Sequence, residues 1–222
     1  ELQSGTKKII SIVRAHLEED AGKSIHDAHP YLTGIDLNRA GAPLLEIVTT
    51  PCLYSPEEAL IYLKTLHQLV KFLGICNGNM QEGSFRCDVN FSLKPVGSSI
   101  LGTRTELKNL NSFRFIEKAI KYEQTRQANL LTQGEKVIQE TRLYCPQREK
   151  TIPLRTKENE EDYRYFPDPD LVPVYIDAEL LQEAQATMPI LPKTIKKSLQ
   201  TLSNLTPEDI QFLLDSKPTY DY

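Results

Sequence analysis

Three short segments of the sequence carry charged side chains at every second position. Residues 9–18, 85–93 and 103–108 alternate with the two-residue period of a β-strand, in which neighbouring side chains point to opposite faces. The polar positions hold Arg14, His16 and Glu18, then Arg86, Asp88 and Asn90, then Arg104, Glu106 and Lys108. Carboxylates interleaved with guanidinium groups suit a magnesium-bound polyphosphate, because carboxylates bind the metal and arginine binds phosphate. A surface network of ion pairs without chemistry explains the same pattern equally well.

Further acidic residues add to this candidate metal site. Glu18, Glu19 and Asp20 form a dense acidic cluster at the end of the first segment, and Glu46 stands inside the apolar run of residues 43–48. A buried, unpaired carboxylate is costly, so a metal or a basic partner would explain Glu46. The commoner alternative is that Glu46 faces solvent on an alternating strand.

Other patterns that suggest nucleotide or cysteine chemistry are weaker. Residues 22–24 resemble the end of a P-loop, but Leu17 stands where the first glycine belongs, which excludes that motif. Residues 162–167 combine aromatic and charged side chains that could stack on bases, although such residues more commonly anchor a loop. Cys87 falls on the apolar face of its strand and is expected in the core, not as a nucleophile.

Two helices are predicted beside these strands. The first has a capping box of Ser55 and Glu58 with Pro56 at its first position, and it ends at Gly74. The second runs from about residue 112 to about residue 131 and ends before a glycine. Its inward positions are Phe113, Ile116 and Ile120, and its outer basic stripe is Arg114, Lys118 and Lys121.

The order of elements indicates the fold class. Further strands are expected at residues 137–144 and 152–155, and the strands are not joined by regular helical crossovers. This pattern predicts an α+β fold with helices packed on a mostly antiparallel sheet. Helical patterns dominate after Asp177, so we expect one domain over residues 1–177 and the beginning of a helical domain over residues 178–222.

Composition narrows the class of protein. The 222 residues are 40% hydrophobic and 25% charged with a net charge of −4, which is typical of a globular chain. The absence of a long apolar run excludes a membrane protein. The four cysteines include no CxxC pair, which argues against a disulfide framework or a zinc ribbon and indicates a reducing cytoplasm.

Five groups of residues resemble a known family. The chain is similar, over about residues 7–177, to the B subunit of bacterial and organellar aspartyl/glutamyl-tRNA amidotransferases. The motifs occur in family order as HLEEDAGK at 16–23, DLNR at 36–39 with PLLEIV at 43–48, EGSFRCDVN at 82–90, ELKNLNSF at 106–113 and DYRYFPDPD at 162–170.

The resemblance implies a kinase-type subunit in protein biosynthesis. With ATP and magnesium it would phosphorylate the side-chain carboxylate of glutamate on glutamine tRNA, or of aspartate on asparagine tRNA. Ammonia released by a glutaminase A subunit would then displace the phosphate, and a small C subunit would complete the complex. The resemblance also implies a cradle like that of glutamine synthetase, and a cytoplasmic or organellar location.

The same resemblance assigns roles to individual residues. The expected magnesium ligands are His16, Glu18, Glu19 and Glu46, with the choice between Glu18 and Glu19 left open. The expected phosphate contacts are Arg86, Arg104 and Lys108, supported by Asp88 and Glu82. Such a site fits phosphoryl transfer, which depends on charge neutralisation and positioning more than on a nucleophile.

The resemblance also leads us to expect missing parts. The family's amino-terminal segment supplies a glutamate and a histidine to the metal site, and its carboxy-terminal tail binds tRNA. Both are expected to be absent from these 222 residues, so this chain alone is expected to be inactive. The competing interpretation is a non-catalytic scaffold that docks tRNA in the same complex.

Overall fold

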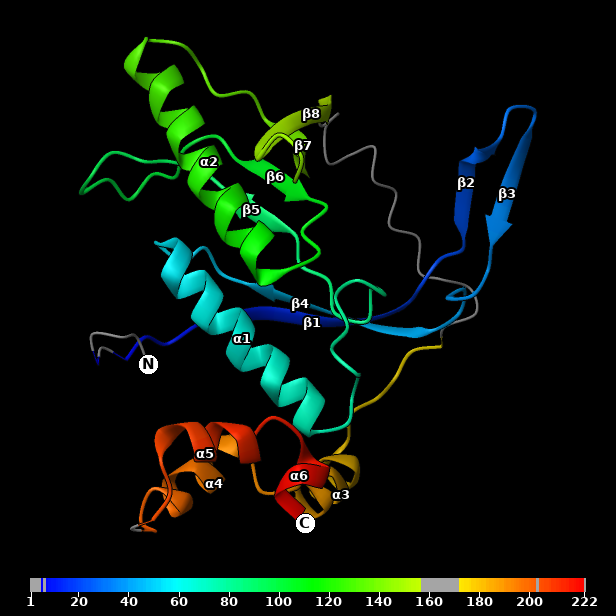
Figure 1. Ribbon diagram of the computed structural model, residues 1–222, viewed down its shortest axis with the longest axis vertical. Coiled ribbons are helices and arrows are strands. Elements are labelled where there is room, and N and C mark those ends of the chain that lie inside the picture. The colour runs from blue at the N-terminus through cyan, green and yellow to red at the C-terminus, as the bar shows by residue number, and fades with distance from the viewer. Residues whose placement is uncertain (1–4, 6, 157–171, 203, 222) are drawn as a thin grey trace. The chain divides into compact units, whose positions relative to one another are not determined.

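The computed structural model describes residue 5 and residues 7–156, 172–202 and 204–221 (Figure 1). The described residues form two compact units. Unit 1 comprises the described residues up to Tyr54 together with residues 172–174, and unit 2 comprises the rest. The buried hydrophobic residues of the described chain all lie in unit 2. None of the described helices is long and apolar enough to cross a bilayer.

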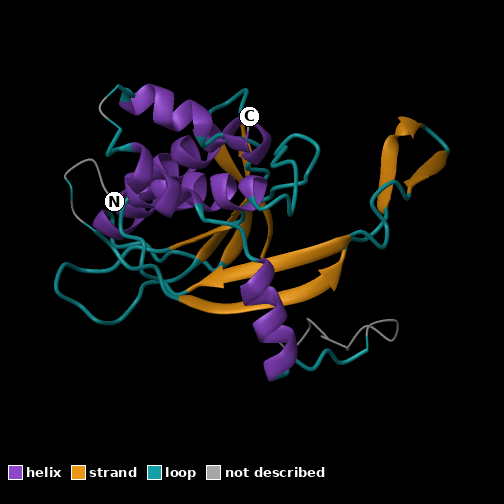
Figure 2. Cartoon of the chain, turned by 90° about the horizontal axis from the view of Figure 1, so that it is seen from below, coloured by secondary structure: helices purple, strands orange, loops and turns teal. Residues whose placement is uncertain are grey.

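Unit 1 is built from two separate pairs of antiparallel strands (Figure 2). Strand β1 (Ile12–Glu19) pairs with β4 (Pro43–Thr49), which confirms the strand predicted over residues 9–18. Strands β2 (Lys23–His29) and β3 (Leu32–Asp36) form a hairpin that the sequence pattern did not predict. The sequence of this hairpin does not alternate regularly between apolar and polar residues, and strand prediction depends on that alternation.

Unit 2 contains a four-stranded sheet in the order β5-β6-β7-β8. Only the β6–β7 pair is parallel, which confirms an α+β fold on a mostly antiparallel sheet. The strands are β5 (Val89–Phe91), β6 (Thr105–Lys108), β7 (Glu140–Cys145) and β8 (Lys150–Thr156). Likeness to a glutamine synthetase cradle stays an expectation from the resemblance.

Three of these strands, β5, β6 and β7, are shorter than predicted. Strand β5 includes only residues 89–91 of the segment expected over residues 85–93. The first half follows a turn in which the Asn79 carbonyl accepts hydrogen bonds from the amides of Ser84 and Phe85, and Gly83 adopts a φ of 75°. The Phe85 amide is thus used in the turn and not in strand pairing.

The two predicted helices are confirmed. Helix α1 (Pro56–Phe72) is capped by Ser55, whose hydroxyl accepts a hydrogen bond from the Glu58 amide at 3.1 Å. Helix α2 (Phe113–Thr132) is capped by Ser112 and connects the parallel strands β6 and β7. It lies across the β5–β8 sheet in Figure 1 and buries Ile116 and Ile120.

Part of the helical region after Asp177 shares a core with the end of α1. Phe72, Ile195, Ile210 and Leu214 form one buried cluster, and the Gln68 side chain donates to the Leu214 carbonyl at 3.1 Å. The helical character of this region is therefore confirmed, whereas the proposed domain boundary stays a prediction. These helices are α3 (Ala178–Thr187), α4 (Pro192–Leu199), α5 (Pro207–Leu213) and α6 (Lys217–Asp221).

Candidate functional site

Register across the β1–β4 pair determines which of the proposed metal ligands share a face. His16 lies directly opposite Glu46, and Glu18 lies opposite Leu44. Positions 16, 18 and 46 therefore belong to one face of the pair, since side chains two residues apart on a strand point the same way. Glu19 lies opposite Pro43 and belongs to the other face. The backbone thus favours Glu18 over Glu19 as a partner for Glu46.

Glu46 has a basic partner on the same face. The Arg14 Nη2 atom lies 3.3 Å from Glu46 Oε2, and the two side chains are 52% and 45% exposed. Glu46 is therefore exposed on an alternating strand, as the commoner explanation predicted. It also has a basic partner, which was the other kind of explanation considered besides a metal. At this exposure such a pair stabilises the fold by only about 0–1 kcal/mol.

The donor chemistry of this face fits magnesium in part. Two carboxylates that are diagonal neighbours on an antiparallel pair are within reach of one hard cation, with an imidazole beside them. Among the described residues, however, no three histidine, cysteine or acidic side chains come close enough together to hold a metal ion. The assignment of His16, Glu18, Glu19 and Glu46 as ligands stays a prediction.

In unit 2, the structure gathers an ion-pair cluster on one face of β5 and β6. Lys108 Nζ lies 2.6 Å from Asp88 Oδ2 and 3.6 Å from Glu106 Oε1. On the same face, Asn90 lies opposite Glu106. The structure therefore confirms that Asp88, Glu106 and Lys108 share a face, and we call these three residues the Lys108 cluster.

The Lys108 ammonium stays charged because of its partners. Partial burial disfavours its charge, but the hydrogen bond and charge of Asp88, together with Glu106, outweigh burial and raise its pKa. Glu106 is itself held from the next strand, because Thr141 Oγ1 donates to Glu106 Oε2 at 2.8 Å. Glu106 was placed on the polar face by its sequence position, but it was not among the predicted site residues.

The remaining predicted site residues of unit 2 lie outside regular strands. Glu82 occupies the turn before β5, where the Asn77 side-chain amide donates to its carboxylate at 3.4 Å. Arg86 is exposed in the segment between that turn and β5, and Arg104 is half-buried directly before β6. Both arginines lie just outside the strands, because β5 and β6 begin later than expected. Their predicted place on the polar face stays a prediction.

Cys87 behaves as an inert thiol. Burial, with the nearby charge of Asp88, raises the pKa of its thiol to about 12. A thiol with so high a pKa forms almost no thiolate at neutral pH, and the thiolate is the reactive form. This supports the prediction that Cys87 is not a nucleophile.

The basic stripe on α2 is largely neutralised by local partners. Lys118 forms an ion pair with Glu149, and Lys121 Nζ contacts Glu117 Oε1. Arg114 is exposed on the same side of the helix. Two of the three predicted basic positions are thus engaged by carboxylates, which lowers the positive charge they offer to a polyanion.

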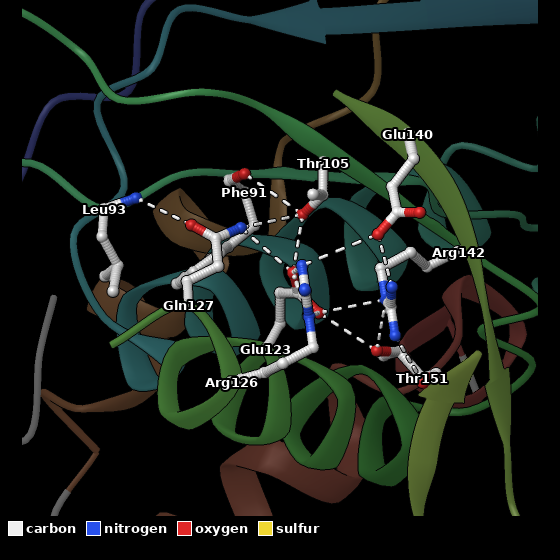
Figure 3. A network of polar contacts seen from close by, with 9 residues as sticks. All are labelled: Phe91, Leu93, Thr105, Glu123, Arg126, Gln127, Glu140, Arg142 and Thr151. Atoms are coloured by element: carbon white, nitrogen blue, oxygen red, sulfur yellow. Dashed lines mark hydrogen bonds and ion pairs between the residues drawn. The ribbon is translucent and has the colours of Figure 1, made fainter. Parts of the chain in front are cut away.

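Sequence reasoning missed a group of buried polar residues beneath the sheet (Figure 3). Glu123 and Gln127 of α2 are both fully buried, at 0% exposure. They continue the helical face of Ile116 and Ile120, at the three- and four-residue spacing of an inward stripe. That spacing was the signal that could have found them, because two polar residues on an inward stripe require buried partners.

The predicted aromatic and charged motif of residues 162–170 lies outside the described residues. Nothing in the structure therefore bears on whether those side chains stack on bases or anchor a loop.

Comparison with known proteins adds the following. Residues 1–182 match a family model described as the GatB/GatE catalytic domain. The whole chain is 66% identical to a protein of Legionella pneumophila (strain Lens) and covers 46% of it. Over 216 residues it is 56% identical to a protein of Paraburkholderia xenovorans, a match that covers 97% of this chain and 44% of that protein. Both relatives are named as the B subunit of aspartyl/glutamyl-tRNA(Asn/Gln) amidotransferase, and the chain spans about half their length.

Proposed function

Because the chain belongs to the GatB/GatE catalytic domain family, we propose that it forms the carboxylate-activating part of a tRNA-dependent amidotransferase. In this proposal an oxygen of the side-chain carboxylate of tRNA-bound glutamate or aspartate attacks the γ-phosphorus of ATP, and ADP leaves. Ammonia from a glutaminase subunit then attacks the acyl carbon, and inorganic phosphate leaves as the amide forms. The substrates are glutamate on glutamine tRNA or aspartate on asparagine tRNA.

The observation that carries the proposal is the Lys108 cluster. It holds a charged ammonium, 32% exposed, on a sheet face between two carboxylates. A positioned ammonium stabilises the negative charge of a transferring phosphoryl group, which is the main requirement of this chemistry. Arg86 and Arg104 would add phosphate contacts near the two ends of the same hairpin, while Asp88 and Glu82 hold neighbouring groups in place.

Magnesium would be held by carboxylates of unit 1. Glu18 and Glu46 would supply oxygen ligands, with His16 beside them, because these three positions share one face of the β1–β4 pair. The bound ion would neutralise charge on the ATP phosphates. Arg14, which pairs with Glu46, would keep that carboxylate oriented on the same face.

The proposed partners follow from the reaction. A glutaminase A subunit would supply ammonia, a small C subunit would complete the complex, and the misacylated tRNA would present the carboxylate. The name of the relatives supports an assembly of this kind, since it is that of one subunit of an amidotransferase. We place the reaction in the cytoplasm, or in an organellar matrix, because that is where tRNA is charged.

The proposal is tested in the full-length protein assembled with its partner subunits. Transfer of labelled phosphate from ATP to glutamate on glutamine tRNA, and to aspartate on asparagine tRNA, is measured for Lys108→Gln and for Lys217→Gln. The control changes an exposed lysine that pairs with Asp221 at a distant helix. We expect the Lys108 variant to lose at least 100-fold in transfer rate and the control to match the wild type.

Two results would reject this function. A Lys108→Gln complex that transfers phosphate at the wild-type rate would remove the Lys108 cluster from the chemistry. A wild-type complex that binds tRNA but forms no acyl phosphate with either tRNA would establish the tRNA-docking scaffold instead.

A further inference from the structure

A network of buried polar groups joins α2 to all four strands of the sheet (Figure 3). It lies on the side of the sheet opposite the Lys108 cluster. On β6, Thr105 and Leu107 are fully buried, whereas Glu106 and Lys108 are partly exposed. Alternate residues of a strand point to opposite faces, so the network and the cluster occupy the two faces of the same strand.

One carboxylate lies at the centre of the network. Glu123 Oε1 accepts hydrogen bonds from Thr105 Oγ1 of β6 and from Gln127 Nε2, each at 3.0 Å. Glu123 Oε2 accepts a hydrogen bond from Thr151 Oγ1 of β8 at 3.0 Å. Arg126, one turn further along α2, donates to both carboxylate oxygens.

A second buried side chain extends the network to the segment that follows β5. Gln127 Nε2 donates to Thr105 Oγ1 at 3.0 Å, and Gln127 Oε1 accepts a hydrogen bond from the Leu93 amide at 3.2 Å. The backbone on both sides of the β5–β6 hairpin is therefore tied to α2.

The network also holds β7 through Arg142. Its Nε donates to Thr151 Oγ1 and its Nη2 to the Thr151 carbonyl, each at 2.9 Å, while its Nη1 contacts Glu140. Arg142 Nε lies 3.6 Å from Glu123 Oε2, so the buried carboxylate faces two guanidinium groups. Among the described residues, every buried side-chain nitrogen and oxygen has a hydrogen-bond partner.

Neighbouring residues of β6 and of β7 link the buried network on one face of the sheet to the Lys108 cluster on the other. Thr105 bonds Glu123 on the buried face, and the next residue, Glu106, contacts Lys108 on the open face. On β7, Thr141 donates to Glu106, and the next residue, Arg142, belongs to the network. A shift of one residue between β6 and β7 would therefore break contacts on both faces at once.

We propose that Glu123 is a positioning residue for the proposed phosphoryl transfer. It fixes Glu106 in two ways, through the adjacent Thr105 on β6 and through Arg142, which adjoins Thr141 on β7. Because Lys108 pairs with Glu106, the position of Lys108 is fixed as well. The inference rests on the function proposed above and extends it to a residue that touches no substrate. Glu123 holds the register of β6 against β7, and that register sets where the Lys108 ammonium stands relative to Glu106.

The test separates positioning from activity in the full-length protein within its complex. Acetylation of individual lysines by acetic anhydride is followed by mass spectrometry, with Lys217 as internal reference. Phosphoryl transfer is measured on the same samples as kcat and as the KM for ATP, well below the unfolding temperature of each variant. The variants are Glu123→Gln, Thr105→Val and Thr105→Ser, with Glu117→Gln as a carboxylate change on the exposed side of the same helix.

We expect Glu123→Gln and Thr105→Val to raise Lys108 acetylation at least threefold and to lower kcat at least tenfold, with a smaller change in KM. Thr105→Ser keeps the hydroxyl and should behave as the wild type, as should Glu117→Gln. If Glu123→Gln does not fold, Thr105→Val decides the matter alone, because it removes one hydroxyl at nearly constant volume.

Each outcome has a distinct meaning. Unchanged Lys108 acetylation in folded Glu123→Gln and Thr105→Val proteins would overturn the positioning role and leave Glu123 with a purely structural one. Raised acetylation with unchanged kcat would support positioning of Lys108 while rejecting the proposed function of the Lys108 cluster.

Discussion

At the scale of single residues, the folded surroundings of Glu123 change the pKa of its carboxyl group. Burial alone would raise the pKa of this carboxyl group, but hydrogen bonds from Arg126, Gln127 and Thr105, together with the charge of Arg126, lower it. The folded protein therefore prefers the ionised carboxylate. The Glu123 carboxyl group has a higher pKa in the unfolded chain than in the folded protein, so the free energy of unfolding depends on pH.

We expect the stability that Glu123 contributes to be present above pH 4.5, the ordinary pKa of the group, and to be lost as the pH falls through its lowered folded pKa. Glu123→Gln should reduce the free energy of unfolding at pH 7 by about 3–5 kcal/mol, because two arginines lose their buried partner. Urea unfolding between pH 7 and pH 3.5 measures both effects, and the variant should show a shallower loss of stability in acid.

Glu117→Gln is the matched control for this measurement. Lys121 lowers the pKa of Glu117 as well, chiefly by a hydrogen bond, but this pair lies at the surface. Its contribution should be small and should disappear in 0.5 M salt, since salt screens exposed charges. A Glu123→Gln protein with the same acid slope as the wild type would contradict the linkage.

The neighbouring carboxylates Glu18 and Glu19 allow a second test at this scale. They lie on opposite faces of β1, and only Glu18 shares a face with His16 and Glu46. In the full-length complex, Glu18→Gln and Glu46→Gln should each lower phosphoryl transfer at least 100-fold and raise the magnesium concentration needed for half-maximal rate. Glu19→Gln should leave both quantities within about threefold of the wild type. The reverse order for Glu18 and Glu19 would show that the strand end twists in the assembled enzyme.

At the scale of elements, the connection from β6 to α2 depends on one unusual backbone conformation. Asn109 directly follows Lys108 and adopts a φ of 64°, in the left-handed region that disfavours most side chains. Its side-chain amide donates to the Tyr144 carbonyl on β7 at 2.9 Å. Asn109 thus ends β6, turns the chain toward α2 and ties that turn to the adjacent strand.

Substitutions at Asn109 should separate the contribution of its left-handed backbone conformation from that of its side-chain hydrogen bond. Asn109→Gly keeps the left-handed backbone and loses the side-chain hydrogen bond, so we expect a loss of about 1 kcal/mol in unfolding free energy. Asn109→Ala loses the hydrogen bond and also strains the backbone, for a total of about 2–3 kcal/mol. Urea unfolding of both proteins checks the order. Equal stabilities of the two variants would mean that the turn relaxes out of the left-handed region.

At the scale of the whole molecule, the net charge of −4 means that contact with the proposed tRNA substrate would have to come from local basic surfaces. The stripe of Arg114, Lys118 and Lys121 on α2 is one candidate, although two of its members are engaged by carboxylates. The three lysines of α4, namely Lys193, Lys196 and Lys197, are exposed and provide a second group of three basic residues.

Replacing the three basic residues of the α2 stripe by Gln should weaken tRNA binding by the full-length complex about three- to tenfold at 100 mM salt. The slope of log Kd against log salt should decrease by about one to two, less than for three free cations, because local carboxylates already pair with two of them. The α4 lysines changed to Gln provide a variant of equal charge. Loss of affinity only in the α4 variant would move the tRNA contact away from α2.

Local patterns in the sequence determined a large part of this protein. The caps at Ser55 and Ser112 and the extent of α1 and α2 follow from residues close together in the chain. The shared face of Asp88, Glu106 and Lys108 follows from the two-residue period of two successive segments. The family also followed from motifs in the sequence, which the matched family model confirmed.

Only the tertiary structure decided how distant segments meet. The register that places His16 opposite Glu46, and so puts Glu46 on the face of His16 and Glu18, depends on pairing between strands about 30 residues apart. The burial of Glu123 likewise depends on Thr105, Arg142 and Thr151, which come from three different strands. A sequence pattern shows which face of an element a residue occupies, but the partners that make a buried charge tolerable come from elements brought together by folding.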